Sequence, residues 1–120
     1  MYALPLLDGI SILEVTGTFE SASYVDLTLS ALADFGIRIT RSDNRFIIYG
    51  NQTYKSNNYI VEGDCSNAAF LSALDYLGGD VKVIGLDENS LQGDKIYKKM
   101  YEGLKNGEKK FDLSNCPDLA

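Results

Sequence analysis

Residues 61–70 read VEGDCSNAAF, and the hydrophobic period of the sequence changes within them. Residues 59–62 form a short apolar run of the kind found in strands. Behind them, apolar side chains recur at helical spacing: Phe70, Ala73, Leu74 and Leu77. The pattern therefore predicts a strand that leads at once into a helix. Ser66 is the expected N-cap of this helix, because a hydroxyl there can accept from unpaired backbone N–H groups.

The same change of period occurs on both sides of this stretch. Upstream, residues 11–17 predict a strand, and a helix is expected from about Ser23 with Gly36 at its left-handed C′ position. Its apolar face comprises Val25, Thr28, Leu29, Leu32 and Phe35. Residues 37–40 and 46–49 predict a hairpin. Downstream, the expected elements are a strand at 81–84, a helix at about 94–104 and a strand at 109–113.

A short internal echo supports a repeated helix–strand unit. The letters LSAL occur at residues 29–32 and again at 71–74, an offset of 42 residues, and each copy precedes a glycine and a predicted strand. Alternation of helical and strand periods is the signature of an α/β protein. The sequence therefore predicts an α/β fold.

Composition narrows the range of partners. The chain has 120 residues, 45% hydrophobic and 23% charged, which is typical of one small globular domain or of parts of two larger ones. A net charge of −6 argues against nucleic acid, and no apolar run is long enough to suggest a membrane span. With no histidine, a zinc site is not expected. Cys65 and Cys116 are interpreted as reduced thiols in preference to a disulfide or a reactive role.

Four segments together resemble the EPSP synthase (3-phosphoshikimate 1-carboxyvinyltransferase) family. They are SASYVDLTL at residues 21–29, VEGDCSNAAF at 61–70, NSLQGD at 89–94 and CPDLA at 116–120. The resemblance covers nearly the whole chain but little more than a quarter of such an enzyme, so the chain is expected to be an internal fragment. It implies an inside-out α/β fold of βαβαββ units, with helices on one face of a mixed sheet.

The resemblance also implies a division of the chain. Residues 1–62 would end the first globule, on the shikimate 3-phosphate side, and residues 63–120 would begin the second, with a crossover strand near 59–64. The two parts could also pack as one compact domain. Because sequence-adjacent helix–strand units usually pack side by side, we expect the compact arrangement.

The family transfers enolpyruvyl from phosphoenolpyruvate to shikimate 3-phosphate, a cytoplasmic step of the shikimate pathway toward chorismate and the aromatic amino acids, without a cofactor or metal. By resemblance, Ser21 and Tyr24 match a Ser-x-x-Tyr motif that binds shikimate 3-phosphate. Asp118 matches the Asp of a Pro-Asp motif that takes part in proton transfer, and is the expected catalytic residue. Many relatives have Lys-Pro where this chain has Ala22 and Ser23.

Purely structural roles compete with these assignments. Ser21 or Ser23 could only cap a helix, Tyr24 could only pack, and Asp118 could only start a helix. For three further residues the structural role is preferred: Asp64 and Ser66 as caps of the second helix, and Asp94 as the start of the third.

The family's other cationic motifs lie outside the 120 residues, so this chain alone is expected to be inactive. Copies of this chain could also associate with one another. The alternative to a transferase fragment is a small non-catalytic α/β interaction domain. The sister family, UDP-N-acetylglucosamine enolpyruvyl transferase, is disfavoured, because it uses a cysteine in a basic loop and neither Cys65 nor Cys116 has an adjacent Lys or Arg.

Overall fold

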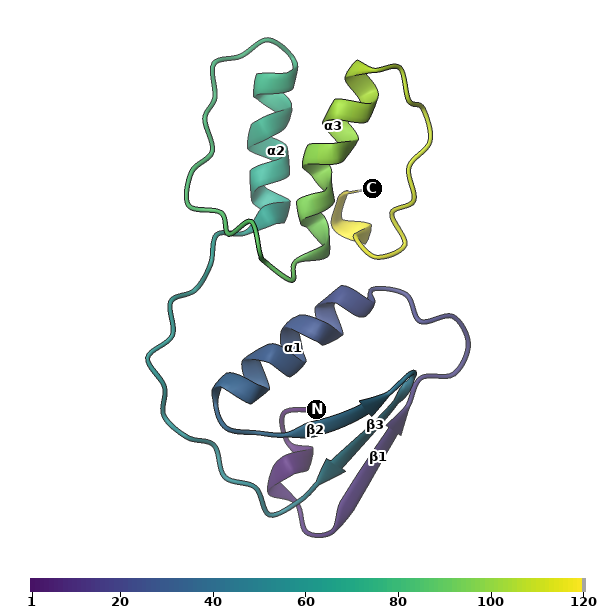
Figure 1. The fold of residues 1–120 in the computed structure, drawn as a ribbon, viewed down its shortest axis with the longest axis vertical. Coiled ribbons are helices and arrows are strands. Elements are labelled where there is room, and N and C mark those ends of the chain that lie inside the picture. The colour runs from purple at the N-terminus through teal and green to yellow at the C-terminus, as the bar shows by residue number, and fades with distance from the viewer. Residues whose placement is uncertain (120) are drawn as a thin grey trace. The chain divides into compact units, whose positions relative to one another are not determined.

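The computed structural model describes residues 1–119, and its internal contacts divide the chain into two compact units (Figure 1). The first unit comprises Met1–Glu20 and Val25–Tyr59. The second comprises Ser21–Tyr24 and Ile60–Ala120. The short segment Ser21–Tyr24 thus packs with residues that follow it by seventy positions or more.

The first unit is built on a three-stranded antiparallel sheet in the order β1-β3-β2. The strands are β1 (Ile10–Glu14), β2 (Ile39–Ser42) and β3 (Arg45–Tyr49), and a short 3₁₀ turn, η1 (Leu4–Leu6), precedes them. Helix α1 (Ala22–Asp34) runs beside the sheet (Figure 1). The buried apolar core of the unit consists of Leu32, Ile37, Phe46 and Ile48.

The local signals of this unit are confirmed. The predicted helix and hairpin are present, and Gly36 adopts the left-handed backbone conformation expected of a C′ residue, with φ of 83°. In the hairpin between β2 and β3, Asp43 takes a positive φ of 52°, a conformation that Asp tolerates better than most residues.

The second unit is helical. Helices α2 (Cys65–Tyr76) and α3 (Tyr97–Lys105) lie side by side (Figure 1), and two 3₁₀ turns complete it, η2 (Gly93–Ile96) and η3 (Pro117–Leu119). The buried residues Ala68, Ala69 and Tyr97 form its apolar centre. The small side chains on α2 allow the ring of Tyr97 to pack against that helix. The third predicted helix therefore exists, but its first turn is 3₁₀.

Three predicted strands are not formed. Residues 59–62, 81–84 and 109–113 lack strand pairing, and Ile60, Val61 and Ile84 are strongly exposed. An apolar run becomes a strand only when its backbone groups find a ladder partner, and none is present for these runs within residues 1–119. The one sheet in this described part is antiparallel, not mixed, and a βαβαββ repeat is not seen.

Of the helices in residues 1–119, none combines the length and the apolar character needed to cross a bilayer.

Candidate functional site

The candidate site lies in the second unit, where the segment Ser21–Tyr24 meets the loop that precedes η3. The backbone N–H of Ser21 donates to the carbonyl of Ser114 at 3.1 Å, and the Ser23 hydroxyl donates to the carbonyl of Asn115 at 2.9 Å. Ser21 has a φ of 56°, which is costly for a residue with a Cβ. These contacts hold the segment in a fixed and partly strained conformation.

The hydroxyl of Tyr24 faces two carboxylates. Its oxygen lies 3.0 Å from Oδ2 of Asp94 and 3.0 Å from Oδ2 of Asp118. Burial, together with the hydrogen bonds to Asp118 and Asp94, raises the pKa of the Tyr24 phenol well above its usual value. Tyr24 therefore keeps its proton throughout the physiological range.

Asp94 lies at the centre of this cluster. The residue is only 2% exposed, and its Oδ2 also accepts a hydrogen bond from the Ser66 hydroxyl at 2.8 Å. Its other oxygen, Oδ1, is buried and has no hydrogen-bond partner. Asp94 does stand in the first turn after a coil, as predicted for the start of a helix, but its side chain joins residues from two other segments.

The two residues before Asp94 fasten this part of the chain. The Gln92 side chain accepts from the backbone N–H of Cys65 at 2.7 Å and donates to the carbonyl of Gly63 at 2.9 Å. At Gly93, an added Cβ would lie 2.5 Å from both the Ser23 hydroxyl and the Asn115 carbonyl oxygen. Only glycine permits this close approach. Residues 92–94 thus act as a clasp, named here the Gln-Gly-Asp clasp.

Of the two residues predicted to cap α2, Asp64 is confirmed and Ser66 is not. Asp64, not Ser66, is the N-cap, and its Oδ1 accepts from the backbone N–H groups of Ser66 (2.8 Å) and Asn67 (3.1 Å). A carboxylate at this position is also stabilised by the positive end of the helix dipole. The Ser66 hydroxyl is therefore available to bind Asp94 instead.

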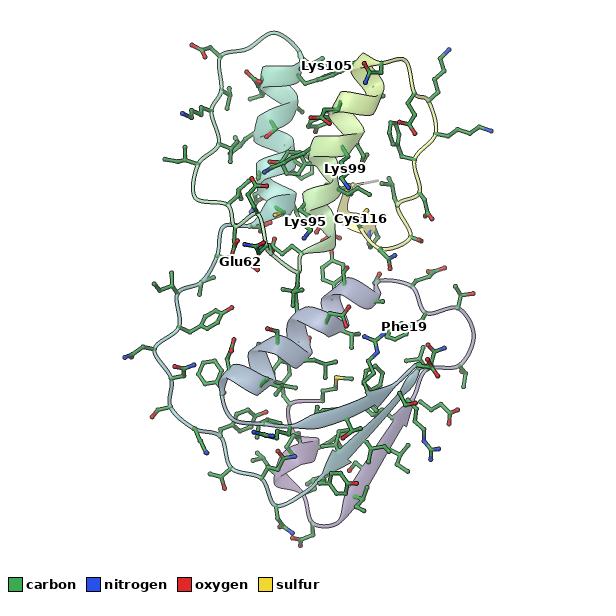
Figure 2. All side chains as sticks on the ribbon, in the orientation of Figure 1. Phe19, Glu62, Lys95, Lys99, Lys105 and Cys116 are labelled. Atoms are coloured by element: carbon green, nitrogen blue, oxygen red, sulfur yellow. The ribbon has the colours of Figure 1, made fainter. Side chains whose placement is uncertain are left out.

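Both cysteines are buried as free thiols in the second unit. Burial raises the pKa of each thiol, and the negative charge of Asp94 raises both further. Figure 2 shows Cys116 together with the lysines of the η2–α3 segment. A raised pKa keeps a thiol protonated and unreactive, so neither cysteine has the properties of a nucleophile.

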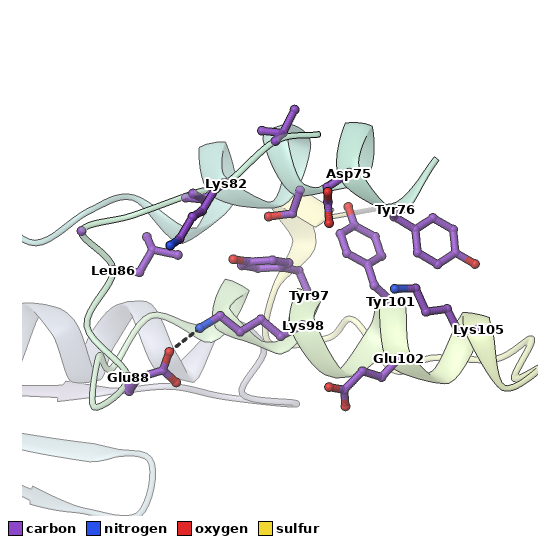
Figure 3. A pocket seen from close by; sticks show the side chains of 14 residues that line it. Asp75, Tyr76, Lys82, Leu86, Glu88, Tyr97, Lys98, Tyr101, Glu102 and Lys105 are labelled. Atoms are coloured by element: carbon purple, nitrogen blue, oxygen red, sulfur yellow. Dashed lines mark hydrogen bonds and ion pairs between the residues drawn. The ribbon is translucent and has the colours of Figure 1, made fainter. Parts of the chain in front are cut away.

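A pocket of about 410 Å³ between α2, α3 and residues 81–88 lies apart from the candidate site residues (Figure 3). Aromatic rings dominate it: Tyr76 and Tyr101 stack with centroids 5.4 Å apart. Lys98 is paired with Glu88 at 2.6 Å, and Lys105 lies over the Tyr76 ring. Lys98 and Lys105 are thus engaged within the protein, and Lys82 is a further lysine of the lining. Within residues 1–119, no cluster of His, Cys, Asp or Glu could hold a metal ion.

The sequence profile of the EPSP synthase (3-phosphoshikimate 1-carboxyvinyltransferase) family matches residues 1–114. The chain belongs to the EPSP synthase family. The 3-phosphoshikimate 1-carboxyvinyltransferases of Clostridium botulinum (strain Eklund 17B / Type B) and Clostridium novyi are each 44% identical to it. The enzyme of Clostridioides difficile is 40% identical.

These alignments cover 99–100% of this chain but only 31–32% of each relative, so the chain spans about a third of their length. They extend over 136–137 positions, more than the 120 residues of the chain, so the relatives carry residues in this region that the chain lacks. Ser21 and Tyr24 lie within the matched EPSP synthase residues, and Asp118 lies just beyond residue 114.

Proposed function

We propose that the chain is part of an enolpyruvyl transferase that joins phosphoenolpyruvate to shikimate 3-phosphate, and that Ser21, Tyr24 and Asp118 serve this reaction. Family membership supports the reaction class. The observation that supports the site is the 3.0 Å contact between the Tyr24 oxygen and Asp118 Oδ2, because it brings two motifs ninety-four positions apart to one point.

The roles follow from the chemistry of the groups. Ser21 adjoins the first turn of α1, where the positive end of the helix dipole favours an anion such as a phosphate. Asp118 is exposed and can accept a proton from a substrate hydroxyl, whereas Tyr24 orients that hydroxyl. No cofactor or metal is needed for these steps. We propose residues 1–62 as the shikimate 3-phosphate side of the enzyme and residues 63–120 as the start of its second globule, in the cytoplasm.

The test is a titration of the isotope-labelled chain with shikimate 3-phosphate, followed by amide chemical shifts. We expect weak binding, with the first perturbations at residues 20–26 and near Asp118. Tyr24→Phe and Asp118→Asn should reduce these shifts, whereas Lys99→Ala, on the exposed side of α3, should not. Shifts confined to residues 95–110 would show unspecific attraction to lysines and would contradict the proposal.

The 120-residue chain alone is proposed to have no transferase activity. Two anionic substrates must be held together by cationic groups, and the three arginines, Arg38, Arg41 and Arg45, all lie in the first unit. Loss of one preorganised electrostatic group already lowers a rate by about a hundredfold or more. Phosphate release with both substrates measures this, and turnover that persists through repurification would overturn it. A non-catalytic interaction domain, the alternative, predicts no response to shikimate 3-phosphate at all.

A further inference from the structure

The hydroxyl of Tyr24 has one proton and two carboxylate neighbours. We propose that Asp94 is a positioning residue: it accepts the Tyr24 proton in a hydrogen bond, and so turns the lone pairs of the Tyr24 oxygen and the carboxylate of Asp118 toward the ligand. This inference rests on the proposed function for the identity of the ligand. It adds to that function a residue, and a physical reason why the substrate hydroxyl already proposed at Asp118 and Tyr24 fits there.

Burial decides which carboxylate holds the proton. Asp94 is 2% exposed, whereas Asp118 is exposed to solvent. A buried carboxylate without donors has lost its hydration and has nothing in its place, whereas an exposed one stays hydrated. The ion pairs in residues 1–119 are Arg41–Asp26 and Lys98–Glu88, so Asp94 depends on hydroxyl donors. The donors to its Oδ2 are Ser66 and Tyr24. Asp94 therefore gains more from the Tyr24 proton than Asp118 does.

The surroundings keep Asp94 in place. Gly93 allows the chain to lie against Ser23 and Asn115, and Gln92 is bonded to the backbone on both sides of Asp64. Ser66 is fixed in the first turn of α2. A side chain held by packing and by several bonded neighbours is preorganised, so it does not need to reorient when a ligand arrives.

The direction of the Tyr24 hydroxyl has a consequence for specificity. A phenol that donates to Asp94 offers only lone pairs elsewhere, so a ligand atom that meets it must itself be a donor. Next to Asp118, which also accepts, the matching group is a hydroxyl and not a phosphate or carboxylate oxygen. This agrees with the substrate hydroxyl already proposed to meet Asp118 and Tyr24.

The experiment uses the full chain labelled with 3-fluorotyrosine, whose phenol titrates in a milder range than that of tyrosine, and ¹⁹F spectra. Tyr24→Phe identifies the Tyr24 signal. In the labelled chain this signal should titrate at higher pH than those of the exposed tyrosines. Asp94→Asn should shift it to lower pH, Asp118→Asn should shift it less, and Asp80→Asn, an exposed control, should leave it unchanged. A larger shift for Asp118→Asn than for Asp94→Asn, or none for Asp94→Asn, overturns the proposal.

A second variant guards against loss of folding. Cys65 and Cys116 are buried in the same unit, so rapid reaction with a thiol reagent reveals an unfolded variant. If the Asp94→Asn variant is unfolded, the proposal is tested with the Ser66→Ala variant instead. It removes the other donor to Asp94 Oδ2, so the Tyr24 signal should titrate at the same or a higher pH, and a shift to lower pH overturns the proposal. None of these titrations needs a ligand, so their failure is distinct from a failure of shikimate 3-phosphate binding.

Discussion

The side chain of Gln92 makes two hydrogen bonds to the backbone next to Asp64. It accepts from the N–H of Cys65 at 2.7 Å and donates to the carbonyl of Gly63 at 2.9 Å. These residues stand just before and at the start of α2, and Gln92 stands just before η2. One amide thus joins the starts of two helical segments that are separated by a long coil. Because Cys65 is buried, its N–H has no easy replacement partner in water.

Replacing Gln92 with alanine should therefore destabilise the second unit. Two hydrogen bonds at about 1 kcal/mol each predict a loss of about 2 kcal/mol, and more if the buried N–H stays unpaired. Urea unfolding, followed by thiol reactivity of Cys65 and Cys116, measures the loss. Asn106→Ala, which removes an exposed amide, is the matched control. Equal stability of the two variants would show that Gln92 is not a structural link.

Gly93 should tolerate no side chain. A Cβ there would lie 2.5 Å from the Asn115 carbonyl oxygen, and backbone cannot move aside cheaply. Gly93→Ala is expected to cost about 1–3 kcal/mol and to displace Ser23 from its bond to Asn115. Thermal unfolding and the amide shifts of residues 21–24 measure both effects.

The matched control for Gly93 is Gly103→Ala, in α3. Its Cβ would also make short contacts, but both are with side chains: 2.4 Å to the carboxylate end of Glu108, which can rotate away, and 3.0 Å to the Phe111 ring, which must shift by a few tenths of an ångström. Alanine is also favoured over glycine inside a helix by about 1 kcal/mol. We expect Gly103→Ala to be close to neutral. If Gly93→Ala were equally mild, the close approach of the Gln-Gly-Asp clasp would be wrong.

Stability should fall as the pH rises above neutrality. Burial raises the pKa of the Cys65 and Cys116 thiols, so the folded state retains protons that the unfolded state loses. A thiol whose pKa is raised by folding contributes fully to the free energy of unfolding at pH values below its pKa in the unfolded state. This contribution is lost as the pH rises through its pKa in the folded state. The decline should begin at about pH 8, where an unfolded thiol starts to ionise.

Thermal unfolding in a reducing buffer, measured from neutral to alkaline pH, checks this expectation. The double variant Cys65→Ala, Cys116→Ala should lose less stability over the same pH interval, because Tyr24, Tyr101 and Lys98 are then the remaining groups with a raised pKa. The variant must be compared with its own value at neutral pH, since the lost thiol packing also lowers its stability. An identical slope for both proteins would contradict the prediction.

The elements that sequence could predict are those whose signals are local. The helices, the hairpin and the left-handed Gly36 depend on spacing and turn residues within a few positions. Strands at 59–62, 81–84 and 109–113 are predicted from short apolar runs, and the first also from the family's crossover strand, but pairing requires a second strand, and this information is not local.

The candidate site divides in the same way. Motif resemblance indicated Ser21, Tyr24 and Asp118, and their roles in catalysis and binding stay predictions. Asp94 was interpreted only as a helix start, because its first-turn position explains an acidic residue. Its contact with Tyr24 spans seventy positions, which no local pattern reveals. The signal that could have drawn attention to it is the adjacent Gln92 and Gly93 within a segment already noted for its resemblance.

An apolar stripe on α2 predicts self-association. Phe70, Leu74 and Leu77 lie on one side of the helix and are 67%, 54% and 79% exposed. Water-exposed apolar side chains gathered on one face favour association, because each buried side chain contributes about 1.5–3 kcal/mol. We expect the mean molar mass from light scattering to rise with concentration. Phe70→Glu with Leu74→Glu should abolish the rise, since two charges would then face the contact, whereas Asn106→Glu, which adds a charge away from the stripe, should not. A constant monomer mass in the unaltered chain, or a rise that survives the double substitution, would show that this stripe does not mediate contact between copies.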